Sequence, residues 1–133
     1  MYLLDTNVCI RYLNGRSPAI RNKLQATNAR DIYVCSIVKA ELFYGAMRSN
    51  NPQRSLANQR KFLKLFTSLP FDDDVALVYG DVRAYLAGQG TPIGSNDLQI
   101  AATALKHNLT LVTHNTREFA RVPNLRWEDW EQA

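Results

Sequence analysis

The sequence predicts an α/β fold in which helices cover both faces of a central, mostly parallel sheet, as an α/β/α sandwich. Short apolar runs typical of strands alternate with longer segments whose apolar residues recur at helical spacing. The length of 133 residues suits one domain with its own core. A composition of 46% hydrophobic and 21% charged residues, without repeats or low-complexity tracts, is that of a globular chain. We therefore expect a single domain over residues 1–133.

The first half of the chain shows two strand patterns and four helix patterns. They cover residues 2–5 (strand), 7–14 (helix), 17–26 (helix), 32–35 (strand), 36–49 (helix) and 51–68 (helix). Gly15 ends the first helix, and Ser17 followed by Pro18 is a typical N-cap with proline at the first helical position. Ser36 is expected to cap the third helix, and Asn51 to start the fourth.

The second half continues the alternation. Its elements are residues 69–71 (strand), 72–89 (helix), 95–107 (helix), 109–113 (strand), 115–120 (helical turn) and 126–128 (strand). The acid run at residues 72–74 favours a helix start through the helix dipole, and Ser95 is expected to cap the next helix. Asn115 and Glu118 fit an N-cap with a reciprocal glutamate three residues later.

Charge and composition narrow the classes of function. The net charge of +4 favours an anionic partner, nucleic acid above all. No apolar stretch approaches the ~18 residues of a membrane helix and no secretory pattern opens the chain, so we expect a cytoplasmic protein. Cys9 and Cys35 lack metal-ligand or redox spacing and are expected to be buried thiols. His107 and His114 also lack such spacing, which argues against a histidine-based zinc site.

The opening stretch MYLLDTN places an acid where the first strand ends and a helix begins. In open α/β folds, ligands bind at the carboxyl ends of the strands, so Asp5 is a candidate ligand or catalytic group. Aspartate is also a good helix N-cap. Both interpretations of Asp5 remain open at this point.

A second acid, Glu41, lies within the helix pattern SIVKAELFYGAMR, on a largely apolar side. An ionised carboxylate there is costly unless it is paired or bound to a metal. Arg48, seven residues on, offers a structural ion pair as the alternative. Gly45 lies one turn from Glu41, and a glycine inside a helix costs ~1 kcal/mol relative to alanine, so we expect it to clear space for something.

A third acid, Asp97, lies in the first turn of a predicted helix in PIGSNDLQIAATAL, where the helix dipole alone accounts for it. The helix dipole also suffices to account for the three aspartates at residues 72–74. Together, however, Asp5, Glu41 and Asp97 could converge above one edge of the sheet. Three carboxylates gathered there would repel one another unless a hard cation lay between them, and carboxylate and water oxygens are what Mg²⁺ and Mn²⁺ prefer.

Four segments in order carry a family resemblance: LLDTN, VKAELFYGA, IGSNDLQIAATAL and LVTHNTREFARVPNLRWEDW. The ordered set resembles the PIN-domain ribonucleases, specifically the VapC-type toxins of bacterial toxin–antitoxin pairs, over essentially the whole chain. The resemblance implies a PIN-like α/β/α sandwich and a Mg²⁺- or Mn²⁺-dependent endoribonuclease acting on a structured RNA such as a tRNA. It also implies a homodimer and a tight complex with a small VapB-like antitoxin.

The family's acidic set corresponds to three positions of this sequence. The resemblance implies that Asp5 and Asp97 are the principal metal ligands, and that Glu41 is a further ligand or orients the attacking water. Thr6 resembles the small hydroxyl residue that orders the first acid. The family often has a fourth acid where this chain has Asn115, so the choice between one metal and two stays open.

Basic residues near these motifs are expected to hold RNA phosphates. Arg11, Arg117 and Arg121 are the candidates chosen for their proximity to the motifs. Glu118, although it lies near Asn115, is assigned to helix capping.

Other classes of protein also gather acids at strand ends. A receiver-like phosphoacceptor domain needs a central strand that ends in Asp, and a phosphatase with an aspartyl nucleophile needs an acid at position 7, where Asn7 stands. Neither pattern is present. A non-catalytic RNA-binding module with a PIN-like fold remains the alternative, and divalent-dependent RNA cleavage separates it from the enzyme.

Overall fold

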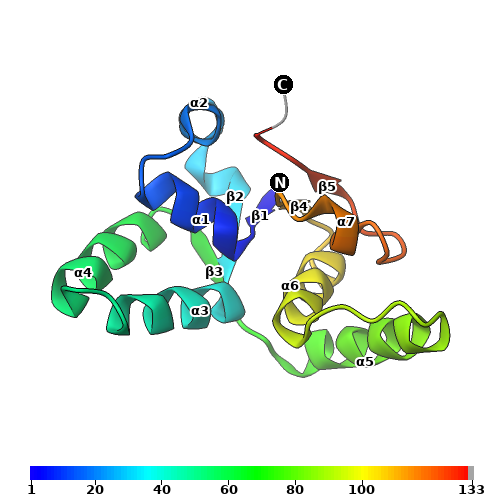
Figure 1. Ribbon diagram of the computed structural model, residues 1–133. Coiled ribbons are helices and arrows are strands. Elements are labelled where there is room, and N and C mark those ends of the chain that lie inside the picture. The colour runs from blue at the N-terminus through cyan, green and yellow to red at the C-terminus, as the bar shows by residue number, and fades with distance from the viewer. Residues whose placement is uncertain (132–133) are drawn as a thin grey trace.

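The computed structural model describes residues 1–131 as a five-stranded sheet flanked by helices (Figure 1). The strands are β1 (Tyr2–Leu4), β2 (Ile32–Cys35), β3 (Thr67–Leu69), β4 (Thr110–Val112) and β5 (Trp127–Glu128). Their order across the sheet is β3-β2-β1-β4-β5, and all four pairings are parallel. The predicted α/β fold with a parallel sheet is confirmed.

The helices fall into two groups on either side of the strands (Figure 1). The first group is α1 (Thr6–Leu13), α2 (Pro18–Ala26), α3 (Ser36–Met47) and α4 (Pro52–Leu63), with a 3₁₀ turn, η1, at Ala29–Asp31. The second group is α5 (Asp73–Gly88), α6 (Ser95–Lys106) and the short α7 (Thr116–Phe119). Packing of α3 against α1 and α4, and of α5 against α6, holds each group together, while α3 also contacts α6.

The predicted helix over residues 51–68 is too long, because α4 ends at Leu63. The backbone N–H groups of Leu65 and Phe66 donate to carbonyls three residues back, which tightens and ends the helix. The strand that follows is Thr67–Leu69 rather than residues 69–71, since Thr67 pairs with Tyr33 of β2. Pairing with a buried neighbouring strand outweighs the helical spacing of the segment before it.

Side-chain caps follow the prediction at some helices and differ at others. Ser17 accepts from the backbone N–H of Ile20 at 3.2 Å, as predicted. Asp72, which was expected only to favour the helix start through the helix dipole, is the N-cap of α5 and accepts from the backbone N–H of Val75 at 3.0 Å. Ser36 and Ser95, by contrast, are the first helical residues themselves, and the residues before them make no side-chain cap bond. The cap predictions at Ser36 and Ser95 were therefore wrong.

The core is made by strands that are apolar on both faces, as expected of a sheet covered by helices. Leu3, Leu4, Val34 and Leu111 are fully buried. Cys9 and Cys35 are buried and free, as predicted. None of the helices in the described part of the chain has the length and apolarity needed to cross a membrane.

Candidate active site

Asp5 follows β1 directly, at the carboxyl end of the sheet, and its side chain is 3% exposed. Its backbone N–H donates to the carbonyl of Val112 in β4 at 2.9 Å. Its Oδ1 accepts from the backbone N–H of Thr6, and its Oδ2 from the hydroxyl of Thr113, both at 2.8 Å. An ordinary N-cap accepts from the second or third helical residue. Asp5 stands at the cap position but bonds only the first helical N–H, so capping does not account for its burial.

The pKa of the Asp5 carboxyl is raised above its ordinary value. Burial is the main cause, and the nearby charge of Glu41 adds to it, while the bonds from Thr113 and Thr6 act in the opposite direction. The burial penalty prevails over two hydrogen bonds. Within residues 1–131, Asp5 forms no ion pair with a Lys or Arg side chain.

Glu41 on α3 is held by two donors rather than by an ion pair. The Thr6 hydroxyl donates to its Oε1 at 2.6 Å, and the Asn96 side-chain amide donates to its Oε2 at 3.3 Å. Arg48 instead lies over the ring of Tyr44, 4.5 Å from the centroid. The alternative of a Glu41–Arg48 ion pair is therefore wrong, and Thr6 links Glu41 to Asp5.

The predicted space beside Glu41 is present. Gly45 and Glu41 line a depression of about 240 Å³ together with residues of α1 and α4. A Cβ built on Gly45 would meet no heavy atom within 4 Å. The surface next to the carboxylate is open, and an alanine at position 45 would also leave it open.

Asp97 is the third residue of α6 and is partly buried. Its pKa is raised to about 7, first by burial, then by the charge of Asp5, by contact with the Glu118 carboxyl, and by Glu41. A helix dipole would act in the other direction, because a helix N-terminus stabilises the ionised carboxylate. The dipole account of Asp97 is thus insufficient, and the carboxyls of Asp5, Glu41, Asp97 and Glu118 form one interacting acidic cluster.

Glu118 is the member of this cluster that the sequence reasoning missed. Asn115 stands at the cap position of α7 but makes no side-chain cap bond, so the predicted reciprocal cap is wrong. The Asn115 side-chain amide instead donates to Asp97 Oδ2 at 3.4 Å, and its backbone N–H donates to the Thr113 hydroxyl at 2.9 Å. The three-residue spacing of Asn115 and Glu118 places both side chains on the side of the turn that lies toward α6.

The donor set of the cluster suits a hard divalent cation, because all its groups are carboxylate, amide or hydroxyl oxygens. Within residues 1–131, no three His, Cys, Asp or Glu side chains are arranged to hold one ion. Mg²⁺ commonly uses only one or two carboxylates and keeps several waters. Burial is the largest cause of the raised pKa of both Asp5 and Asp97 and neighbouring carboxylates add to it, so a bound cation would favour their ionised forms.

The three arginines singled out for RNA contact differ in their surroundings. Arg11 Nε lies 2.8 Å from Glu131 Oε1 in an ion pair, and Arg121 donates to the Pro92 carbonyl at 3.2 Å. Arg117 is exposed. Arg11 also shares a depression of about 440 Å³ with Asn115, whose side chain donates to Asp97.

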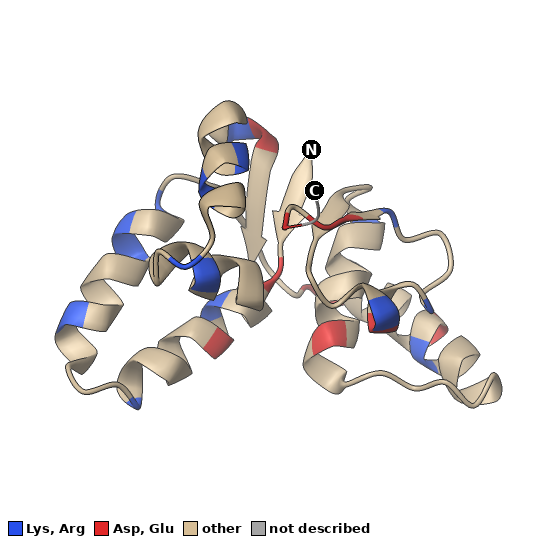
Figure 2. Cartoon of the chain, turned by 45° about the horizontal axis from the view of Figure 1, so that its top comes forward, with Lys and Arg blue, Asp and Glu red and all other residues tan. Residues whose placement is uncertain are grey.

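Charge is divided unevenly along the chain. Residues 1–64 contain eleven of the 16 Lys and Arg but only three of the 12 Asp and Glu. Figure 2 shows the basic positions spread over the α1–α4 side, with acidic segments where the two helix groups face each other. This distribution suits a site where the acidic residues bind a cation and the neighbouring basic residues contact a polyanion.

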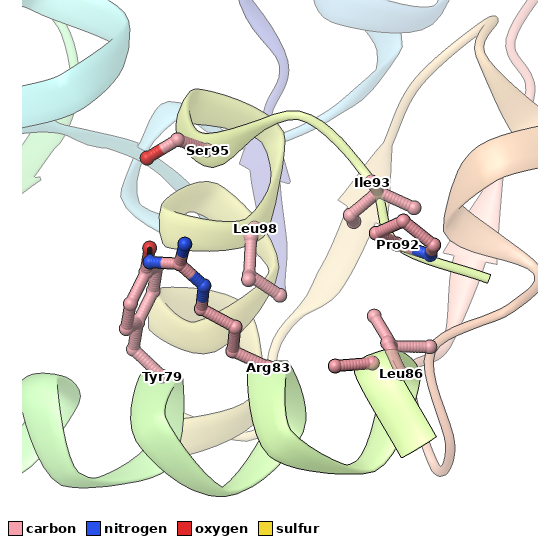
Figure 3. A pocket seen from close by; sticks show the side chains of 8 residues that line it. Tyr79, Arg83, Leu86, Pro92, Ile93, Ser95 and Leu98 are labelled. Atoms are coloured by element: carbon pink, nitrogen blue, oxygen red, sulfur yellow. Dashed lines mark hydrogen bonds between the residues drawn. The ribbon is translucent and has the colours of Figure 1, made fainter. Parts of the chain in front are cut away.

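A third depression, of about 210 Å³, lies between α5 and the start of α6 (Figure 3). Its walls are mainly apolar, and Arg83 donates to the hydroxyl of Tyr79 at 3.0 Å on one side. No residue of the acidic cluster lines it. The groups capable of acid–base or metal chemistry therefore gather at the carboxyl ends of the strands.

Comparison with known proteins was consistent across sequence and structure. Residues 2–125 match the PIN domain family. The chain is 40% identical, over 97% of both chains, to the tRNA(fMet)-specific endonuclease VapC of Salmonella typhimurium, and 42% identical, over 97% of both chains, to Ribonuclease VapC2 of Haemophilus influenzae. The solved DNA-bound VapBC of Salmonella typhimurium matches with a TM-score of 0.92 at 40% identity, over 97% of both chains. VapBC2 of Rickettsia felis, bound to a DNA fragment from its promoter, matches with a TM-score of 0.91 at 37% identity, over 97% of this chain and 98% of that one.

Proposed function

Because the chain belongs to the VapC ribonuclease toxins of the PIN-domain family, we propose that it hydrolyses RNA phosphodiester bonds with a divalent cation held at the acidic cluster. It acts as a single PIN domain over residues 1–133, in the cytoplasm, and inhibits translation and growth. The observation that carries the proposal is the convergence of four carboxyls at one sheet edge, with the pKa of Asp97 raised to about 7.

Each residue of the cluster has a role in the proposed reaction. Asp5 and Asp97 hold the cation, which is Mg²⁺ or Mn²⁺, and Thr113 fixes the Asp5 carboxylate through its 2.8 Å hydrogen bond. When bound, such a cation lowers the pKa of a water and offsets charge on the phosphoryl oxygens. Glu41, held by the Thr6 hydroxyl, orients the attacking water and accepts its proton. Glu118 adds negative charge beside Asp97.

The substrate we propose is a structured RNA such as a tRNA. The similar Salmonella typhimurium protein is named a tRNA(fMet)-specific endonuclease. The excess of Lys and Arg in residues 1–64 supplies phosphate contacts, so binding should weaken as salt rises. Arg11 on α1 lines a depression with Asn115 and is one candidate for phosphate contact, and Arg117 and Arg121 near α7 are two others.

We also propose a homodimer and a complex with a VapB-like antitoxin. The similar solved structures from Salmonella typhimurium and Rickettsia felis are VapBC complexes. A basic antitoxin side chain placed between Asp5, Glu41 and Asp97 would neutralise the cluster as a cation does. Coupled folding of a disordered antitoxin segment suits the coverage of such a surface.

The test is cleavage of a tRNA pool by purified protein, with sequencing of the RNA ends. We expect EDTA to abolish cleavage and Mg²⁺ or Mn²⁺ to restore it, while Ca²⁺ restores little because its looser coordination organises a water poorly. Products should carry a 5′-phosphate and a 3′-hydroxyl. Full activity in excess chelator would contradict the proposed dependence on a metal. Salt-sensitive RNA binding without any cleavage would favour the non-catalytic RNA-binding module.

A further inference from the structure

His114 follows β4, between two residues that hold the acidic cluster. Its neighbour Thr113 donates to Asp5, and its neighbour Asn115 donates to Asp97. The His114 side chain is 63% exposed, yet its Nδ1 lies 2.9 Å from Oδ2 of Asp129, whose side chain is only 4% exposed. A surface ring is thus fixed by a nearly buried carboxylate that follows β5.

The Asp129 bond determines which ring atom is presented outward. An ionised carboxylate only accepts hydrogen bonds, so Nδ1 carries the hydrogen of the Nδ1–Oδ2 bond. The other carboxylate oxygen, Oδ1, accepts from the backbone N–H of Glu131 at 3.0 Å, which holds Asp129 in place. The Nε2 atom of His114 remains as the outward group.

The surroundings of His114 indicate what this atom can reach. The ring lines the depression of about 440 Å³ whose other residues are Asn7, Ile10, Arg11 and Asn115. Asn115 also donates to Asp97 of the acidic cluster, so this depression adjoins the proposed site of cleavage. Its polar lining is Asn7, Arg11, His114 and Asn115, and a nucleotide next to the scissile bond would meet these groups.

We propose that His114 is a substrate-binding residue whose Nε2 hydrogen-bonds the ribose 2′-hydroxyl of an RNA nucleotide beside the cleavage site. This inference rests on the proposed ribonuclease function. A 2′-hydroxyl both donates and accepts, so it pairs with Nε2 whether or not that atom carries a proton. Arg11 on the same depression matches the adjacent phosphate by charge. The Asp129–His114 pair thereby favours RNA over DNA at one position.

The test uses an RNA oligonucleotide that spans the mapped cleavage site, and a series in which one ribose at a time is 2′-deoxy. Water attacks in the proposed reaction, so removing a 2′-hydroxyl leaves the bond cleavable. We expect the wild-type protein to lose about 3- to 10-fold in kcat/KM at one deoxy position. His114→Ala should lose a similar factor on the all-RNA substrate and nothing further at that position. Asp129→Asn, which replaces the two acceptor oxygens of the carboxylate by one amide oxygen and one NH2 donor, should reduce the deoxy penalty in part.

His107→Ala, a change of the other exposed histidine, is the matched control and should behave as wild type. Circular dichroism and the melting temperature establish that each variant is folded. Penalties of deoxy substitution that stay the same in His114→Ala would overturn the inference, since they would show that no 2′-hydroxyl contacts this ring. Failure of the wild-type protein to cut the all-RNA substrate would instead overturn the proposed function.

Discussion

The two sides of the acidic cluster are built differently. On the β1–α3 side, Asp5 and Glu41 accept short hydrogen bonds from threonine hydroxyls, at 2.8 Å and 2.6 Å. On the α6–α7 side, Asp97 receives one longer bond of 3.4 Å from Asn115 and faces a second carboxyl, Glu118. The first side is orientated by protein donors, whereas the second carries charge that the protein leaves uncompensated. A bound cation or a proton should therefore act mainly on Asp97.

The largest expected effect comes from removing charge on the orientated side. Asp5→Asn should lower RNA cleavage more than about 100-fold, because it removes a principal ligand. The amide oxygen can keep the bond from the Thr6 N–H, so the melting temperature without metal should not fall, and relief of repulsion can raise it.

Asp73→Asn is the matched control, because Asp73 is exposed in the first turn of α5, far from the cluster in sequence. It should leave cleavage nearly unchanged. Equal losses of cleavage in Asp5→Asn and Asp73→Asn would show that Asp5 is no more important for the reaction than an acid at a helix start. The measurement is the single-turnover cleavage rate at saturating Mg²⁺.

A smaller effect should follow from breaking the hydroxyl support of Asp5. Thr113→Val keeps the side-chain shape but removes the donor to Asp5 and the acceptor of the Asn115 N–H. We expect cleavage to fall about 10-fold and the free energy of unfolding to fall by about 1–3 kcal/mol, since Thr113 is fully buried. Denaturant titration and cleavage assays on the same protein check both values, and unchanged cleavage would show that Asp5 does not depend on Thr113 for its orientation.

Local signals explain which parts of the fold could be predicted from the sequence. Ser17 and Pro18 carry a cap pattern in adjacent residues, and the Ser17 cap forms. The strand β3 was misplaced because two of its three residues are exposed, so its apolar pattern is weak. Its position is decided by pairing with β2, which is a contact between segments far apart in the chain.

The acidic cluster shows the same division between local and tertiary signals. Asp5 and Glu41 were selectable because acids are costly at a buried strand end and on an apolar helix face. Glu118 was not, because an Asn-x-x-Glu spacing reads locally as a cap. Only the packing of α7 beside α6 shows that the Glu118 carboxyl faces Asp97. Sequence alone could not distinguish these two uses of one spacing.

The pH dependence of the melting temperature, which we expect to amount to a few degrees, tests whether the charge on the α6–α7 side is uncompensated. The pKa of Asp97 is raised from an ordinary value of 3.8 to about 7, so the folded state holds a proton that the unfolded state has released. The resulting stabilisation is complete below about pH 3.8 and is lost as the pH rises through about 7.

In chelator, the wild-type melting temperature should therefore fall relative to that of Asp97→Asn between pH 5 and pH 8, a window chosen around the raised pKa. Added Mg²⁺ should reduce this fall in the wild-type protein, because the cation replaces the proton as the compensating charge. Parallel melting curves for the two proteins across that range would show that Asp97 does not hold the proton.

The smallest expected effect tests the neutral residue on the uncompensated side. Asn115→Asp adds a negative charge next to Asp97, and a charged oxygen binds a divalent cation more tightly than an amide oxygen does. The Mg²⁺ concentration for half-maximal cleavage should fall a few-fold. Asn115 makes no side-chain cap bond, so the substitution removes no cap, and the added like charge should lower the melting temperature in chelator. An unchanged metal requirement would confine Asn115 to positioning Asp97 through its 3.4 Å hydrogen bond, and would leave Glu118 as the only added charge on that side.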